Sequence, residues 1–154
     1  MSAGSDLIAR FRRCARGAAT VEAAMVVPLM LSVGLGATEA GNMVNETHRM
    51  KAGLAAGARL LARAQNPANL HAQARNLAVT GQITGGTPRI AGWSVDQVVI
   101  DYDMVPNPGE IYTGGTTIRI VRLQTSKPYN GLGLMRLAGA HNVTARHEER
   151  WTGG

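Results

Sequence analysis

Glu22 is the first residue of this sequence whose type and position suggest a specific chemistry. It is the only charged residue within AATVEAAMVVPLMLSVGLGAT, which covers residues 18–38. An acidic side chain at the centre of a membrane helix costs roughly 2.5 to 3.5 kcal/mol, and less near the end of the helix. A carboxylate kept there despite this cost is expected to have a cationic partner.

Other residue types that commonly perform catalysis or bind metals lack the required spacing. His48, His71, His141 and His147 do not follow a metal-ligand pattern, and no calcium-binding loop accompanies Asp96, Asp101 and Asp103. Phosphate-binding, dinucleotide-binding and nucleophile-elbow motifs are missing from the sequence. We therefore expect no catalytic residue, no metal and no cofactor, and we do not expect an enzyme.

The basic residues fall into two groups. Arg10, Arg12, Arg13 and Arg16 precede the apolar stretch. A second set, in the C-terminal part of the chain, could contact nucleic acid or another anionic surface: Arg119, Arg122, Lys127, Arg136, Arg146 and Arg150. Interleaved acids and few aromatic residues favour a solvated surface for this second set, so nucleic-acid binding is not expected.

The element that must position Glu22 is an apolar helix. Residues 18–38 would reach roughly 31 Å at about 1.5 Å per residue, which matches the hydrocarbon core of a bilayer. A cleaved secretory signal and a buried core helix are the alternatives, but the small-x-small cleavage pattern is poor and a polar face is almost absent. The sequence predicts a membrane span, with a kink at Pro28 because proline removes a helical hydrogen bond.

Charge predicts the orientation of this span. The four leader arginines come before it, whereas Glu39 and Glu46 follow it ahead of the next basic residue, Arg49. The positive-inside rule places the N-terminus in the cytoplasm and residues 42–154 outside. The single cysteine, Cys14, lies in the basic leader, so the chain cannot form an internal disulfide.

Beyond the span, the pattern predicts a small α+β domain. The helix is expected to continue to Gln65 with an apolar face that includes Met43, Met50, Leu54, Ala58 and Leu61. Gly53 and Gly57 form a small-xxx-small pair, which can permit close helix approach, but in an Ala-rich helix outside the membrane we expect that these glycines are simply tolerated. A short helix should follow, and then strands over residues 94–104, 116–124 and 140–151, with a possible short helix over residues 132–137. These strands should form a small antiparallel sheet packed on the outer half of the long helix.

Length and composition agree with one small domain and one anchor. The chain has 154 residues, is 45% hydrophobic but only 4% aromatic, and carries a formal net charge of +6. We expect a basic leader over residues 1–17, the membrane half of the helix over 18–41, its extension over 42–65 and the outer domain over 66–154.

The string GAATVEAAMVVPLML resembles the start of type IV pilin-like proteins, most closely the TadE-like pseudopilins of tight-adherence (Flp/Tad) pilus systems. The resemblance covers residues 10–65 well and 115–150 loosely. Pilins of this system often have Tyr after the glutamate and TadE-like proteins often have Phe, whereas this chain has Ala23. That difference argues against a major pilin.

The resemblance implies a specific maturation. A prepilin peptidase would cut after Gly17 and leave Ala18 as the new N-terminus. Glu22 would then lie about one helical turn from the new α-ammonium, where it can neutralise that charge or the corresponding charge on a neighbouring subunit. The implied partners are prepilin peptidase, other pilin and pseudopilin subunits and the inner-membrane pilus platform.

The resemblance also implies a location and a role. The chain would be a single-pass protein of the bacterial inner membrane, with its outer domain in the periplasm or outside the cell, and would serve as a minor structural subunit of the pilus or its assembly machinery. The alternative is a signal-anchored envelope protein that is never processed and whose outer domain binds a partner or a surface.

Overall fold

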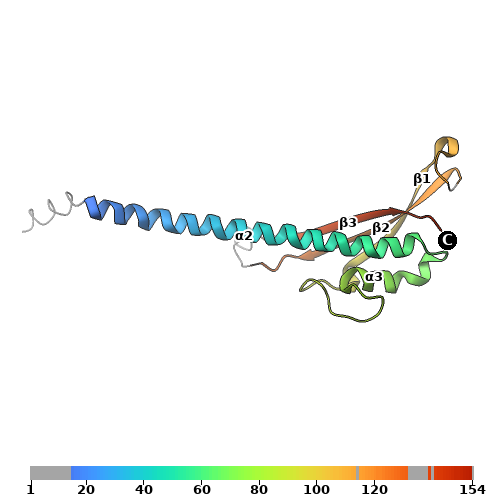
Figure 1. Cartoon of the computed structure of the whole chain (residues 1–154), viewed down its shortest axis with the longest axis horizontal. Helices are drawn as coiled ribbons and strands as arrows, with labels where there is room; N and C mark the ends of the chain where they lie inside the picture. Colours follow the sequence, from blue (N-terminus) through green and yellow to red (C-terminus); the bar gives the residue numbers. More distant parts are fainter. Residues whose placement is uncertain (1–14, 114, 132–138, 140, 154) are drawn as a thin grey trace, which may run out of the picture. The chain divides into compact units, whose positions relative to one another are not determined.

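The computed structural model describes residues 15–113, 115–131, 139 and 141–153. In chain order the elements are α2 (Ala15–Ala62), η1 (Pro67–Leu70), α3 (His71–Thr80), η2 (Val95–Gln97), β1 (Val98–Pro106), η3 (Pro108–Glu110), β2 (Thr117–Pro128) and β3 (Asn142–Arg150), as Figure 1 shows. The chain divides into two compact units, Met1–Glu39 and Ala40–Gly154. The α+β prediction is confirmed.

Helix α2 contributes to both units and contains Pro28 within its assigned span. Proline cannot donate the amide hydrogen bond that would reach the carbonyl of Ala24. The hydroxyl groups of Ser32 and Thr38 donate to the carbonyls of Pro28 and Gly34, at 2.8 and 2.9 Å. The predicted kink at Pro28 remains a prediction.

The unit of residues 40–154 is built on a three-stranded antiparallel sheet in the order β1-β2-β3. Side chains alternate between the two faces of the sheet, and one face points into the core. On this inner face, Val98 of β1 pairs with Thr125 of β2, and Thr125 pairs with Ala145 of β3. Val121, Leu123 and Val143 are buried on this same inner face. They pack with Met50, Leu54, Ala58 and Leu61 of α2, so the apolar face predicted for this helix is confirmed.

Gly53 and Gly57 are the places where α3 approaches α2. A Cβ atom at Gly53 would lie 2.2 Å from the carbonyl oxygen of Ala78, and one at Gly57 would lie 2.7 Å from that of Ala74. Real Cβ atoms do not come this close to a backbone oxygen, so both positions need glycine for packing. The expectation that this pair is simply tolerated was therefore wrong, and the glycines permit close helix approach.

The C-terminal residues return to the end of α2. The backbone N–H of Thr152 donates to the carbonyl of Ala62 at 2.9 Å, and the indole N–H of Trp151 donates to that of Ala64 at 2.9 Å. The last carbonyls of a helix lack partners within the helix itself. The tail supplies a partner for the carbonyl of Ala62 and joins the C-terminal end of the chain to the end of α2.

Several predicted element bounds were wrong by a few residues. The first strand begins at Val98 rather than residue 94, because Val95–Gln97 form a 3₁₀ turn with a capping box between Ser94 and Gln97. The second strand runs on to Pro128, so Lys127 belongs to a strand and not to the predicted loop. The helix ends at Ala62 rather than Gln65. The possible short helix over residues 132–137 lies outside the described residues.

Candidate functional site

The residues predicted to form the processing and assembly site lie together near the start of α2. Gly17, Ala18 and Glu22 are exposed residues of this helix, and Glu22 follows Ala18 by one helical turn. A Cβ atom at Gly17 would meet nothing within 4 Å. Glycine at this position is therefore not explained by packing, in contrast to Gly53 and Gly57.

The predicted leader is only partly within the described chain. Arg16 lies in the first turn of α2, whereas Arg10, Arg12, Arg13 and Cys14 lie outside the described residues. The proposed role of these arginines as a topology signal stays a prediction.

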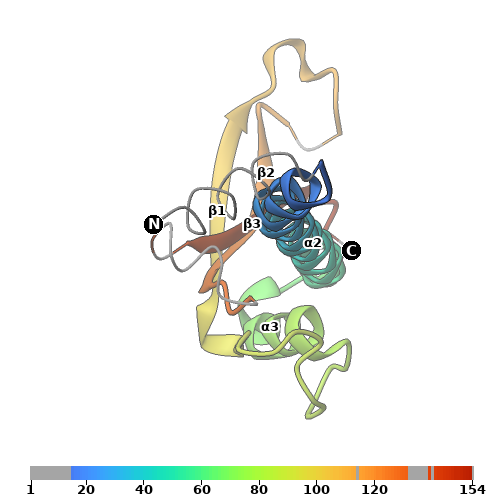
Figure 2. The same ribbon diagram turned by 90° about the vertical axis from the view of Figure 1, so that its left-hand side faces the viewer.

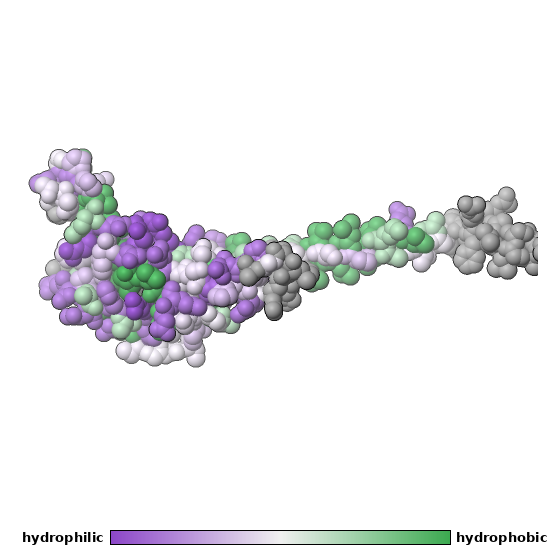
Figure 3. Space-filling model, turned by 180° about the vertical axis from the view of Figure 1, so that it is seen from behind, coloured by the Kyte–Doolittle hydropathy of each residue, from purple (hydrophilic) through white to green (hydrophobic). Residues whose placement is uncertain are grey.

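The helix that carries Glu22 presents large apolar side chains to its surroundings. Between Val21 and Leu35, Met25 is 73% exposed and Met30 is 70% exposed. Figure 3 shows hydrophobic residues along this part of the helix. Part of α2, between Gly17 and Ala62, is long and apolar enough to cross a bilayer. So many exposed apolar side chains indicate contact with lipid or with other apolar helices.

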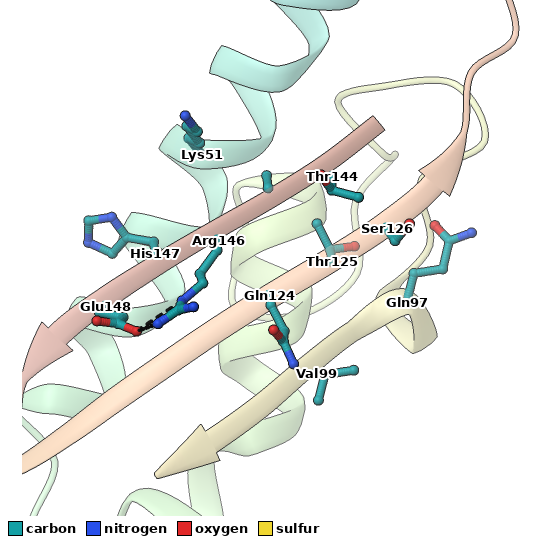
Figure 4. Close-up of a pocket in the computed structure, with 11 residues that line it drawn as sticks. Lys51, Gln97, Val99, Gln124, Thr125, Ser126, Thr144, Arg146, His147 and Glu148 are labelled. Atoms are coloured by element: carbon teal, nitrogen blue, oxygen red, sulfur yellow. Dashed lines mark hydrogen bonds and ion pairs between the residues drawn. The ribbon is translucent and has the colours of Figure 1, made fainter. Parts of the chain in front are cut away.

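An open groove of about 810 Å³ lies beside the sheet in the unit of residues 40–154. Its lining combines amides and hydroxyls with charged groups, including Gln124, Ser126, Thr144, Arg146 and Glu148, as Figure 4 shows. In the described chain, no hydrogen bond joins the hydroxyl of Ser126 or Thr144 to a histidine or a carboxylate. The groove thus offers polar contacts but no activated nucleophile among these residues.

An ion-pair network covers the outer face of the sheet. Arg122 pairs with Asp103 of β1 and, at 2.7 Å, with Glu148 of β3, which also pairs with Arg146. The register places Arg122 between Asp101 and Glu148, so opposite charges face each other across strands. Hydrogen bonds from Arg146 and Arg122 lower the pKa of Glu148, and the hydrogen bond to Glu148 raises the pKa of Arg122. These charged side chains pair with one another within the sheet, so few of their charges remain available to bind a ligand.

A buried ion pair joins α2 to the end of β2. The ammonium of Lys127 lies 2.9 Å from Oε2 of Glu46, and the lysine side chain is fully buried. Its ammonium also donates to the carbonyl of Ala91 at 3.2 Å. Sequence reasoning missed this pair because the second strand was predicted to end at Gln124. The residues that follow, Thr125, Ser126 and Lys127, show no apolar alternation that would have extended it.

A second polar contact joins α3 to β1. Nε2 of His71 lies 2.7 Å from the hydroxyl of Tyr102, and the two rings stack at 5.8 Å between centroids. Burial and the nearby charge of Arg75 lower the pKa of His71, while burial raises the pKa of Tyr102 against the opposing effect of Arg119. Both rings are therefore kept neutral near pH 7, which suits a structural contact.

Among the described residues, no three histidine, cysteine, aspartate or glutamate side chains are grouped closely enough to hold a metal ion. Nε2 of His147 lies 3.2 Å from Oε2 of Glu149. The sequence expectation that the chain has no metal, no cofactor and no catalytic residue stays an expectation.

Comparison with known proteins found one family model that matches part of the chain. No curated protein and no solved structure matches the chain. Residues 17–59 match the model of the family described as TadE-like protein, and this match begins at Gly17. It covers the apolar helix and its extension as far as Arg59, including Glu22, Gly53 and Gly57. Over this segment, which is less than half of the chain, the sequence is similar to the TadE-like protein family.

Proposed function

We propose that this chain is a minor, pilin-like structural subunit of a Tad pilus or of its assembly machinery. The observation that carries the proposal is the family match over residues 17–59, together with an exposed apolar helix that bears one carboxylate near its start. The helix would anchor the chain in the bacterial inner membrane and later contact other subunits. The chain would have no catalytic activity of its own.

The proposed maturation begins with cleavage after Gly17 by prepilin peptidase on the cytoplasmic side. Two observations support this position. The family match begins at Gly17, and no packing contact explains a glycine there. A peptidase subsite that excludes a side chain would explain it. Cleavage converts the amide nitrogen of Ala18 into an α-ammonium one turn from the carboxylate of Glu22.

The proposed partners follow from this maturation. Besides prepilin peptidase, they are other pilin and pseudopilin subunits and the inner-membrane platform of the pilus. The exposed apolar helix supports contacts within a membrane or a helical bundle, because its side chains between Val21 and Leu35 are exposed in the isolated chain.

Mass spectrometry of the N-terminus tests the proposal. Chain expressed with a Tad prepilin peptidase is expected to begin at Ala18, and chain expressed without the peptidase should retain the leader. Gly17→Leu should block cleavage without loss of folded protein, because no described side chain contacts this position. A mature chain that still begins at Met1, or one that begins near Thr38, contradicts the proposal and favours a signal-anchored protein or an ordinary exported one.

A further inference from the structure

The connection between β1 and β2 projects from the unit of residues 40–154 and is held by hydrogen bonds of Asn107. Asn107 is 4% exposed, and its side-chain amide donates to the carbonyls of Tyr112 and Gly115 at 2.7 and 2.8 Å. Its backbone N–H donates to the carbonyl of Thr116 at 2.8 Å. Figure 2 shows this connection extending away from α3. Asn107 therefore holds the connection in one shape.

This shape presents apolar side chains to solvent. Ile111 is 78% exposed, more than any other large hydrophobic side chain in the described chain, and Tyr112 is 56% exposed. Arg150 lies over the ring of Tyr112, with its guanidinium carbon 5.6 Å from the ring centroid. We call residues 110–112 the hairpin tip. A preorganised apolar tip is typical of a contact site, because little conformational entropy is lost when it binds.

The charge at the tip restricts its partner. Glu110 directly precedes Ile111, with a positive φ of 50°, and no described cation pairs with its carboxylate. An acidic residue at the point of contact disfavours an anionic lipid surface. The chemistry that fits is an apolar recess with a cation beside it.

The same unit contains such a recess. A pocket of about 410 Å³ is lined by Pro67, Tyr102 and Met104, with Arg119 at its side. The hydrogen bond between His71 and Tyr102 fixes the tyrosine ring, and Arg119 lies over the ring of Trp151 at 4.8 Å. No described carboxylate forms an ion pair with Arg119. We call this pocket the Tyr102 recess.

We propose that the hairpin tip of one copy docks into the Tyr102 recess of a second copy. Ile111 would enter the recess between Pro67 and Met104, and Glu110 would lie beside Arg119 of the second copy. Glu110 and Arg119, neither of which forms a described ion pair within one copy, would thereby pair with each other across the two copies.

The contact is reciprocal. Tyr102 and Met104 lie on β1, and the tip follows the end of the same strand. Two hairpins placed antiparallel about a two-fold axis bring each tip to the recess of the other copy at the same time, as an isologous interface requires. The surface involved is small, so the affinity in dilute solution should be low, and confinement of both copies to one membrane should raise occupancy.

Edge-to-edge pairing of two β1 strands is the competing arrangement, because β1 is an edge strand of the sheet. Antiparallel pairing centred on Tyr102 would place Asp101 of one copy opposite Asp103 of the other. Like charges directly opposite each other destabilise a strand pair. The tip-in-recess contact avoids this repulsion.

Site-directed crosslinking of full-length chain in nanodiscs tests the contact. In a Cys14→Ser background, two differently tagged copies carry Ile111→Cys and Met104→Cys and are treated with a short bis-maleimide. A heterodimeric product is expected. The matched control replaces Ile111→Cys by Ile83→Cys, since Ile83 is also an exposed isoleucine at 55%. Equal yields for the two pairs would overturn the proposal.

A charge exchange identifies the ion pair. Glu110→Arg should reduce the crosslink yield about fivefold, because it faces Arg119 with a like charge. The double variant Glu110→Arg with Arg119→Glu should restore the yield. If the double variant unfolds because Trp151 loses its cation, Glu110→Gln decides the question. An unchanged crosslink yield in Glu110→Gln contradicts the contact.

A fluorescent label at Ile111→Cys distinguishes a second copy from lipid or another protein. The emission of this label should shift to the blue in nanodiscs that hold two copies but not in nanodiscs that hold one. A blue shift with a single copy would show that the tip contacts lipid and would overturn the proposal. The contact does not require cleavage after Gly17, so its failure leaves the proposed function standing.

Discussion

At the residue scale, Lys127 and Glu46 show how one buried pair connects distant parts of the chain. A fully buried ammonium is costly unless it is paired and hydrogen-bonded. Glu46 supplies the countercharge at 2.9 Å, and the carbonyl of Ala91 accepts a hydrogen bond from the same ammonium. Because Glu46 is on α2 and Lys127 is near the end of β2, the pair holds the helix in one register against the sheet.

Removing only the carboxylate should destabilise the domain strongly. Glu46→Ala leaves Lys127 buried without a countercharge, and we expect a loss of about 3 kcal/mol in the free energy of unfolding. Urea unfolding of the full chain in mild detergent, followed by tryptophan fluorescence, measures this loss. The matched variant Glu46→Leu with Lys127→Met replaces both charges by apolar groups and should recover most of the stability. Equal stability of Glu46→Ala and the unchanged chain would show that the pair is unimportant.

At the scale of elements, α2 and α3 pack closely because glycine occupies two successive turns of α2. Gly53 faces the carbonyl of Ala78, and its Cβ would also lie 3.0 Å from the ring of Trp93. Trp93 is 1% exposed and donates through its indole N–H to Thr125 at 3.0 Å. Helices α2 and α3 and the sheet therefore meet at Gly53, where an added Cβ atom would have to displace the backbone carbonyl of Ala78.

Gly53→Ala should thus destabilise the domain even though alanine favours helices. The overlap with a backbone carbonyl is expected to cost about 2 kcal/mol net of the gain in helix propensity. Tryptophan fluorescence during urea unfolding reports the change, since Trp93 is at the contact. Gly41→Ala is the control on the same helix, because its Cβ would meet nothing within 4 Å, and it should leave the midpoint unchanged or raise it. A loss of stability in both variants would point to a general effect of alanine on α2.

The period of apolar residues made the long helix and its buried face predictable from the sequence, since that signal is local. Lys127 was placed wrongly because the residues after it, Pro128 and Asn130, are typical of a turn, whereas tertiary pairing with β3 extends the strand to Pro128. The spacing of Gly53 and Gly57 was visible, but the sequence did not show which element approaches them. Contacts between elements distant in sequence, such as His71 with Tyr102, leave no periodic signal.

At the scale of the whole molecule, the two ends of α2 have different roles. The glycines near its C-terminal end are required by packing, whereas Gly17 near its start has no such requirement. Large apolar side chains are exposed at the N-terminal end and buried at the other. One helix is thus a core element of the domain of residues 40–154 and, in the proposed function, also the element that attaches the chain to lipid or to other subunits. Glu22 is the only acidic residue between Gly17 and Pro28.

Changing Glu22 tests the attachment role separately from folding. Glu22→Ala removes the carboxylate that would neutralise the α-ammonium of Ala18 or that of a neighbouring subunit, and we expect loss of piliation and of pilus incorporation, with cleavage after Gly17 largely intact. Electron microscopy and immunoblotting of sheared pili measure assembly, and mass spectrometry of the membrane fraction measures cleavage.

Glu22→Asp keeps the charge on a shorter side chain and should retain part of the assembly. Because Glu22 is exposed on α2, neither variant should lower the unfolding midpoint of the domain. Normal piliation in Glu22→Ala would mean that the charge pair does not select subunits, and the cost of the carboxylate would then need another explanation.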